Sequence, residues 1–155
     1  MKVDVVYEER YWYPDDGSIV WLSGYGIVDD NGGYLARDAP QLAAAGLRVA
    51  GVAGAARHHP EALASDAAAP GRALELRRDA GNEHDANAIA VATDDGQLLG
   101  FVPRELAAEL APAIDAGEPW SAVVLREHRP SPRDPRTGVT MLLGAAGSIE
   151  LRDRS

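Results

Sequence analysis

Two apolar segments joined by an acidic turn constrain the fold of this chain more than any other feature. Residues 88–93 and 97–102 are rich in Ala, Val, Ile and Leu, and Asp94-Asp95-Gly96 lies between them. Glycine in such a turn supplies the positive φ that a tight reversal requires, and apolar segments of this length pair as antiparallel strands. The sequence therefore predicts a β-hairpin over residues 88–102.

Other short segments predict that the rest of the chain is also rich in strands. In residues 72–78, Leu74 and Leu76 alternate with Glu75 and Arg77, as in a half-buried strand. The turn signal Asp29-Asp30-Asn31-Gly32-Gly33 predicts a reversal between residues 25–28 and 34–35. The remaining expected strands are residues 3–6, 19–22, 47–53, 121–127 and 139–143, with a last edge strand at 148–151.

The helix signals are fewer. Pro103 suits the first position of a helix, and Gly117 suits its C-terminal cap. The apolar positions between them recur every fourth residue: Leu106, Leu110 and Ile114. Pro112 interrupts the backbone bonding, so we expect a kink or two consecutive short helices. A helical turn is expected over residues 40–45. The segment that starts near Pro60 is expected to form either a short helix or a loop.

Composition limits the class of protein. The 155 residues, 46% of them hydrophobic, suit one domain with its own core, and 28 alanines against 9 aromatic residues indicate small core side chains. The lack of cysteine excludes disulfides, thiolate zinc clusters and a cysteine nucleophile. The acidic first residues and the absence of an apolar run of ~20 residues favour an intracellular, cytoplasmic protein without a membrane partner.

The formal net charge of −9 argues against broad binding along a nucleic-acid duplex, because phosphates repel an acidic surface. Residues 1–46 hold 3 basic and 8 acidic residues, residues 47–128 hold 7 and 13, and residues 129–155 hold 5 and 3. The compact arginine cluster lies at residues 129–136. It is most simply a solvated hairpin loop, and the alternative is a track for a phosphate backbone.

A spaced set of motifs in the middle of the chain carries a family resemblance. The strand at residues 74–78 is followed by Asn82-Glu83-His84-Asp85-Ala86-Asn87-Ala88-Ile89 and, after the acidic turn, by Gly100-Phe101-Val102-Pro103-Arg104. This order of strand, loop and strand, turn, Gly-aromatic strand and Pro-Arg helix start resembles the HIRAN domain. The resemblance covers residues 47–127, extending toward 143.

Similarity to HIRAN domains implies a fold that is mainly β with some α: a small, OB-like, partly open β-barrel with one or two packed helices. It also implies binding of single-stranded DNA at a free 3′ end. In that interpretation His84 stacks on the last nucleotide and Asp85 accepts a hydrogen bond from its hydroxyl, while a terminal phosphate would be repelled. The expected DNA-binding residues are Asn82, His84, Asp85, Arg57, Arg78, Phe101 and Arg104.

The sequence departs from the family pattern at one place. Aligning the first barrel strand puts Ala53 and Gly54 where the DNA-end binders carry an Arg-aromatic pair. Half of that clamp is therefore missing, and whether DNA binding is retained stays open. Arg57 with His58 or His59 is a candidate substitute.

Each candidate also has a purely structural interpretation. Asn82, Asp85 and Asn87 are residue types that shape loops by bonding to nearby backbone amides. Core packing is the favoured interpretation for Phe101 and exposure in a loop for His84. The aromatic residues Trp12, Tyr13 and Trp21 are expected to pack on one side of the barrel, and exposure of residues 11–13 would indicate a partner-binding patch instead.

Catalytic and metal motifs are weak. The serines lack a nucleophile elbow, residues 51–54 lack the Lys-Ser/Thr of a phosphate loop, and the four histidines lack HxH or HxxxH spacing. We therefore expect no enzyme activity, cofactor or metal. The alternatives to DNA-end binding, with a role in DNA repair, are a protein-interaction module that kept the barrel and lost DNA binding, and a metal-dependent phosphoesterase.

The expected organisation has three parts. Residues 1–46 form an N-terminal extension of short strands packed on the barrel, residues 47–143 form the HIRAN-like domain, and residues 144–155 form an edge strand or tail. The role of the extension and the oligomeric state are left open by the sequence.

Overall fold

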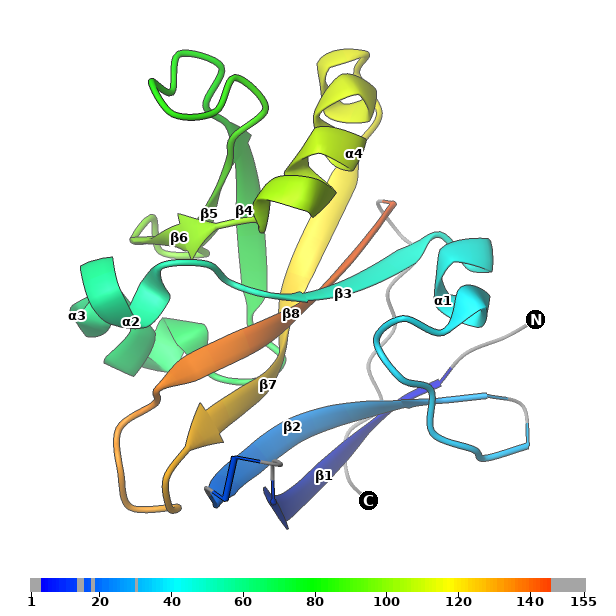
Figure 1. Ribbon diagram of the computed structural model, residues 1–155, viewed down its shortest axis with the longest axis vertical. Helices are drawn as coiled ribbons and strands as arrows, with labels where there is room; N and C mark the ends of the chain where they lie inside the picture. The colour runs from blue at the N-terminus through cyan, green and yellow to red at the C-terminus, as the bar shows by residue number, and fades with distance from the viewer. Residues whose placement is uncertain (1–3, 14–15, 18, 30, 146–155) are drawn as a thin grey trace.

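A strongly curled antiparallel sheet forms most of the molecule in the computed structural model, which describes residues 4–13, 16–17, 19–29 and 31–145 (Figure 1). The strand order is β1-β2-β7-β4-β5-β6, with β8 beside β7 and β3 beside β8. The strands are β1 (Asp4–Trp12), β2 (Val20–Val28), β3 (Leu47–Gly51), β4 (Ala73–Arg78), β5 (Ile89–Thr93), β6 (Leu98–Phe101), β7 (Trp120–Arg129) and β8 (Gly138–Ala145). The predicted strand-rich fold and the hairpin over residues 88–102 are confirmed.

Six of these strands curl into a partly open barrel, whose seam is closed by one isolated bridge. Strands β3, β8, β7, β4, β5 and β6 pair in that order, and the bridge between Ala53 and Phe101 joins the two ends. The amide of Ala53 donates to the Phe101 carbonyl at 2.8 Å, and the Phe101 amide donates to the Ala53 carbonyl at 3.0 Å. Register shifts in β5–β6 and β7–β8 help the sheet to bend. The predicted mainly β, partly open barrel with packed helices is confirmed.

Gly100 is what lets the seam close. A Cβ on Gly100 would lie 2.4 Å from the Ala53 carbonyl oxygen and 2.7 Å from Cγ1 of Val52. Such distances are inside van der Waals contact, so the two chain segments approach this closely only because residue 100 has no side chain. The Gly-aromatic pair at residues 100–101 therefore has a structural cause.

The hairpin of β1 and β2 extends the sheet outside the barrel. One edge of β7 pairs with β4 at residues 122–123 and with β2 at residues 126–129. Gly24 lies at this junction, where a Cβ would be 2.2 Å from the Leu125 carbonyl oxygen. The close crossing of β2 over β7 thus requires glycine at position 24.

Two hydrophobic clusters lie on opposite faces of β7 and β8. The barrel interior holds Val124, Met141 and Leu143, together with residues of β5, β6 and α4 (Arg104–Asp115). The second cluster is outside the barrel and consists of Tyr25, Ile27, Leu42, Leu47, Leu125 and Leu142. This second cluster joins β2 and α1 (Pro40–Ala44) to the barrel wall.

The helices follow the sequence signals with one correction. The helix α4 is continuous through Pro112, so the alternative of two consecutive helices is wrong. It ends as predicted at Gly117, which has φ +90°, and Gly117 and Glu118 donate to the carbonyls of Ile114 and Ala113. The other helices are α2 (Ala55–His58), α3 (Pro60–Ala64) and η1 (Asp66–Ala68), so a helix does begin at Pro60. No helix of the described ranges is both long and apolar enough to cross a bilayer.

A second prediction, that the aromatic residues of the first segment pack on the barrel, is wrong for Tyr13. Tyr13 is 69% exposed, so it does not pack on the barrel, and Trp21 is half-buried. Tyr25 and Ile27 are the buried β2 residues of the second hydrophobic cluster. The side chain of Trp12 and the expected strand at residues 148–151 lie outside the described residues.

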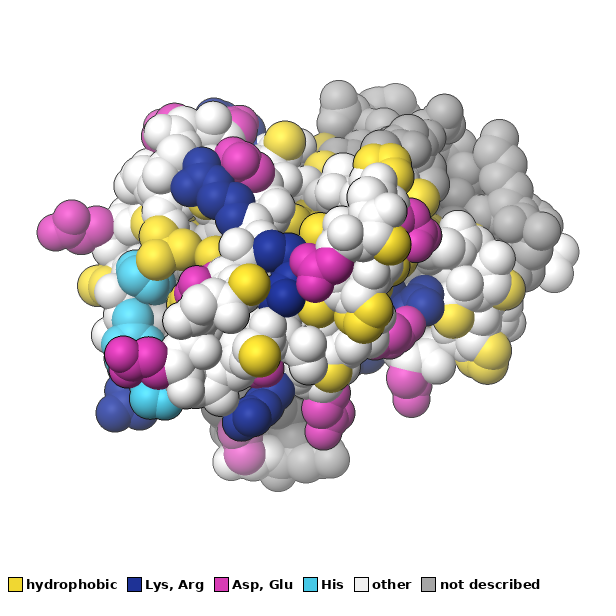
Figure 2. Space-filling model, turned by 90° about the horizontal axis from the view of Figure 1, so that it is seen from above, with side chains coloured by type: hydrophobic (Ala, Val, Ile, Leu, Met, Phe, Trp, Pro, Cys, Tyr) yellow, Lys and Arg dark blue, Asp and Glu magenta, His cyan; other side chains and the backbone are white. Residues whose placement is uncertain are grey.

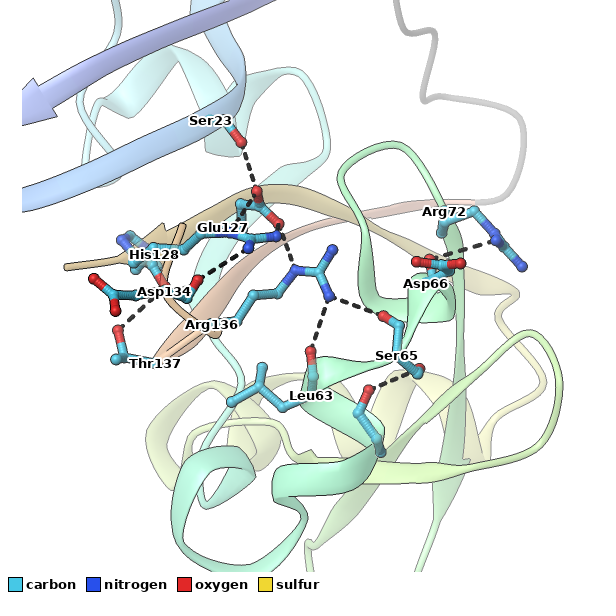
Figure 3. A network of polar contacts seen from close by, with 12 residues as sticks. Ser23, Leu63, Ser65, Asp66, Arg72, Glu127, His128, Asp134, Arg136 and Thr137 are labelled. Atoms are coloured by element: carbon cyan, nitrogen blue, oxygen red, sulfur yellow. Dashed lines mark hydrogen bonds and ion pairs between the residues drawn. The ribbon is translucent and has the colours of Figure 1, made fainter. Parts of the chain in front are cut away.

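The basic loop at residues 129–136 is a third correction, because Arg129 and Arg136 both pair with the buried Glu127. Figure 3 shows Arg136 beside Glu127, Leu63 and Ser65. Arg136, with a side chain only 7% exposed, pairs with the buried Glu127 and donates to the carbonyls of Leu63 and Ser65 at 3.1 and 2.8 Å. Arg129 donates to Glu127 at 3.0 Å, and the Ser23 hydroxyl does so at 2.8 Å. Within this part of the loop only Arg133 remains exposed without a side-chain partner among the described residues. The cluster therefore ties the loop to α3 and to β2, and it is not a solvated cationic track.

Candidate functional site

A hollow of about 380 Å³ lies where the barrel seam closes, and we call it the terminal pocket. The loop between β4 and β5 and the start of α4 stand at this end of the molecule (Figure 1). The pocket is lined by Ala53, His58, Asn82, His84, Asp85, Ala88, Phe101, Val102 and Arg104. Five of the seven residues expected to bind DNA therefore meet in one place: Asn82, His84, Asp85, Phe101 and Arg104.

Asn82 shapes the loop that borders the pocket. Its side-chain oxygen accepts hydrogen bonds from the amides of His84 and Asp85 at 2.9 and 3.1 Å, and its amide nitrogen donates to Asp79 at 3.1 Å. Every polar atom of the Asn82 side chain thus has a partner inside the loop. These bonds are the ones that the structural interpretation of Asn82 predicted, and they stabilise the loop.

The Asp85 carboxylate has one oxygen committed to the loop and one that faces the pocket mouth. Its Oδ1 accepts from the Asn87 amide at 2.9 Å, whereas its Oδ2 is 3.9 Å from Nε of Arg104. The Asp85 side chain is 19% exposed and the Arg104 side chain 78%. The arrangement is a partly buried acceptor next to a solvated cation, with Arg104 also donating weakly to the His84 carbonyl at 3.4 Å.

Two flat side chains complete the wall. His84 is exposed, as the loop interpretation predicted. Phe101 is half-buried and belongs to neither hydrophobic cluster, so core packing does not describe it. Ala88 and Val102, which are buried, add apolar side chains to the lining. The pocket thus combines two flat side chains with alkyl groups, both of which suit an aromatic ring.

Arg78 does not line the terminal pocket. Its guanidinium donates to Asp115 at 2.8 and 3.1 Å and to the carbonyls of Ala88 and Ala86 at 2.7 and 3.0 Å. The hydrogen bond and charge of Asp115 raise the pKa of Arg78, and Arg78 in turn lowers the pKa of Asp115. Arg78 therefore fastens the second half of the β4–β5 loop to α4, and its contacts make it a positioning residue.

Arg57 also lies outside the terminal pocket, in a neighbouring hollow with His58. Figure 2 shows this end of the molecule, where histidine side chains gather along one edge of the face. In the described part of the chain, no group of three or more His, Cys, Asp and Glu side chains is arranged to hold a metal ion.

The sequence match decides the family. The model of the HIRAN domain matches residues 47–140, more than half of the chain. The chain belongs to the HIRAN domain family. The matched part of this HIRAN protein begins at the first residue of β3, so the β1–β2 hairpin and α1 lie outside it.

Solved structures with a similar fold include other HIRAN domains. The crystal structure of the HIRAN domain of human HLTF is 23% identical, covers 67% of this chain and 80% of that one, and has a TM-score of 0.46. A protein from Lactobacillus plantarum is 22% identical over 62% of this chain and 91% of that one, with a TM-score of 0.41. Among curated proteins, none matches this HIRAN chain.

The pocket of this HIRAN protein includes a residue that is not in the expected DNA-binding set. The sequence offers His58, together with Arg57, only as a candidate substitute for the missing Arg-aromatic pair, and the structure places it in the terminal pocket. The signal was Gly54, whose φ of +79° turns the chain from β3 into α2, and the amide of His58 donates to the Gly54 carbonyl at 2.9 Å. Ala53 lines the same pocket, so the departure from the family pattern falls inside the site.

Proposed function

We propose that this HIRAN protein binds single-stranded DNA at a free 3′ hydroxyl end and catalyses no reaction. The observation that carries the proposal is the free oxygen of the Asp85 carboxylate beside Arg104, at the mouth of a pocket with two flat side chains. A terminal hydroxyl is a hydrogen-bond donor, and an ionised carboxylate accepts it with a strong charge-assisted bond. A terminal phosphate brings negative charge to the same oxygen and is repelled.

The size and walls of the pocket support one nucleotide as the occupant. The volume of about 380 Å³ lies in the range of roughly 300 to 1,000 Å³ that small-ligand pockets occupy. Phe101 and His84 offer faces on which any base can stack, at about 1 to 3 kcal/mol per base. Arg104 supplies a cation for the adjoining phosphate. Recognition of this kind requires no particular sequence, only an accessible strand end.

The chain has a formal net charge of −9, but the cation Arg104 at the terminal pocket can still attract a DNA phosphate. Most arginines whose contacts are described pair with carboxylates, for example Arg48 with Glu109 and Arg72 with Asp94. Among the described residues, Arg104 is held by a 3.9 Å ion pair and a 3.4 Å hydrogen bond alone, so its charge remains available to a ligand. Binding is thereby confined to one end of the molecule, while the remaining acidic surface repels duplex DNA at long range.

The test is a fluorescence anisotropy titration of a 5′-labelled oligothymidylate of about ten nucleotides, a length within the span of an OB-type fold. We expect the 3′ hydroxyl form to bind at least about tenfold more tightly than the 3′ phosphate form. Asp85→Asn should remove most of that preference. Its matched control is Glu83→Gln, which removes one charge from an exposed side chain of the same loop that does not line the terminal pocket.

Two results would overturn the proposal: no binding of either oligonucleotide, or binding that ignores both the end group and Asp85→Asn. The first would favour a protein-interaction module, for which the exposed Tyr13 (69%) and Ile19 (52%) of the N-terminal segment provide apolar contact area. Cleavage of the oligonucleotide on addition of Mg²⁺ would favour the phosphoesterase.

A further inference from the structure

His58 borders three hollows: the terminal pocket and two others. A DNA strand held in the terminal pocket could continue into either of the other two. The first, which we call the lateral hollow, has a volume of about 520 Å³ and is lined by α2, including Arg57, and by Thr137 and Gly138 at the start of β8. The second, the hairpin hollow, has a volume of about 410 Å³ and includes Glu61 and Gln97. His58 is the one lining residue that the terminal pocket shares with each of the other two hollows.

The two exits differ in charge. Arg57 is exposed, and within the described ranges its guanidinium has no hydrogen bond or ion pair. The hairpin hollow instead presents the exposed carboxylate of Glu61 and has no basic side chain other than His58 and His59. A phosphodiester carries one negative charge, so it is attracted toward the lateral hollow and repelled from the hairpin hollow.

His58 lies on the short helix α2, shortly after the turn at Gly54. Gly54 adopts the left-handed conformation at φ +79°, and a Cβ there would be 3.4 Å from Cδ2 of His58, so the turn lies next to the ring. The imidazoles of His58 and His59 meet edge to face with centroids 6.4 Å apart. The His58 side chain is exposed, so a ligand can reach it from the hollows that it borders.

We propose, on the basis of the DNA-end binding proposed above, that the strand leaves the terminal pocket over His58 and runs through the lateral hollow to Arg57. His58 contacts the nucleotide that precedes the terminal one, and Arg57 pairs with a phosphate further along. The helix α2 therefore provides the second half of the binding site, next to Ala53 and Gly54, where the sequence lacks the expected Arg-aromatic pair.

The test compares two labelled oligothymidylates with 3′ hydroxyl ends: a dinucleotide, and one of about ten nucleotides, which is long enough for the path. Arg57→Ala should weaken binding of the longer strand by about threefold to tenfold and lower its salt-dependence slope by about one, while leaving the dinucleotide unchanged. Arg77→Ala is the matched control, because Arg77 is exposed on β4 and lines none of the three hollows. His58→Ala should weaken both strands.

Glu61→Gln distinguishes the two exits. If the strand uses the lateral hollow, Glu61→Gln changes affinity no more than Arg77→Ala does. If Glu61→Gln strengthens binding of the longer strand and Arg57→Ala has no effect, the proposed path is overturned while DNA-end binding stands. If the unmodified protein binds neither oligonucleotide, the proposed function itself fails and the path with it.

Discussion

The Asp85 carboxylate and the Arg104 guanidinium face each other at the mouth of the terminal pocket, with Oδ2 of Asp85 3.9 Å from Nε of Arg104. At this distance the two charges attract but do not form a hydrogen bond, so the free carboxylate oxygen retains its capacity to accept one. The two residues come from different elements, the β4–β5 loop and the first turn of α4. Pairing of β5 with β6, which sets Ala90 opposite Phe101, brings those elements together.

Arg104→Gln should weaken binding of the 3′ hydroxyl oligonucleotide by about tenfold and reduce the salt-dependence slope by about one. The reason is that the Arg104 side chain is 78% exposed and only loosely held, so its charge is directed to the ligand. The stability of the protein should change by no more than about 0.5 kcal/mol. Anisotropy titrations at several salt concentrations measure both quantities, and an unchanged slope would exclude a phosphate contact for Arg104.

Arg78→Lys should weaken DNA binding although it keeps the positive charge. A lysine cannot reproduce the planar fork that holds Asp115 and the carbonyls of Ala86 and Ala88 together. We expect a lower free energy of unfolding, because these bonds are charge-assisted and the Arg78 side chain is only 15% exposed. Urea unfolding and anisotropy measure the two effects. Full DNA affinity in the Arg78→Lys variant would show that charge alone matters at this position.

The sequence was sufficient to predict the elements that depend on local chemistry. The hairpin at Asp94-Asp95-Gly96, the helix end at Gly117 and the alternation of Leu74 and Leu76 all depend on neighbours in sequence, and the structure contains each of them. The gathering of Asn82, His84, Asp85, Phe101 and Arg104 could be anticipated because all five lie within the matched motifs of one family.

What the sequence could not predict were the long-range partners of charged side chains. Arg78 and Arg136 look like free cations in the sequence, but Arg78 donates to Asp115, 37 residues away, and Arg136 donates to the Leu63 carbonyl, 73 residues away. The closure at Ala53 and Phe101 is also long-range. It explains Gly100 only after the two strands are seen together.

Gly100→Ala should open the barrel seam. The new Cβ would meet the Ala53 carbonyl oxygen at 2.4 Å, so the Ala53–Phe101 bridge must separate at a cost of roughly 1 to 3 kcal/mol. Hydrogen exchange at the Ala53 amide should accelerate, and DNA-end preference should fall because Ala53 and Phe101 both line the pocket. The control is Gly81→Ala in the β4–β5 loop, where a Cβ has no atom within 4 Å and φ is not positive. Equal exchange rates in the two variants would contradict the role given to Gly100.

Arg136→Ala should destabilise the protein far more than Arg133→Ala in the same loop. Removing Arg136 leaves the buried Glu127 with only Arg129 and Ser23 and frees the carbonyls of Leu63 and Ser65. Loss of one partner of a buried ion pair costs about 3 kcal/mol, whereas Arg133 is exposed and makes no side-chain contact among the described residues. Thermal unfolding should show a midpoint lowered by roughly 6 to 12 °C for Arg136→Ala. Similar midpoints for the two variants would mean that the Glu127 network adds little to stability.

His128 should make the stability of the protein depend on pH. Burial, followed by the charges of Arg126 and Arg37, lowers the pKa of His128 from 6.5 to about 4, against the opposite effect of Glu127. The folded protein therefore keeps the imidazole neutral in the pH interval in which the unfolded chain binds a proton. Its contribution to stability is complete above pH 6.5 and is lost as the pH falls from 6.5 toward about 4.

The size of this effect is up to about 3 kcal/mol, since each pKa unit corresponds to about 1.4 kcal/mol. Urea unfolding of the wild type should show the free energy of unfolding decreasing through that interval. His128→Gln should flatten the decrease, because it removes the titrating group while leaving a polar partner for the Thr140 hydroxyl, which is 2.8 Å from Nε2. The exposed His84, changed to Gln, serves as the control and should retain the wild-type slope. If His128→Gln and His84→Gln give the same slope, the pH dependence arises from other groups, foremost the carboxylate of Glu127. Burial raises the pKa of Glu127, but the hydrogen bonds from Arg129, Arg136 and Ser23 outweigh it, so the pKa is lowered overall.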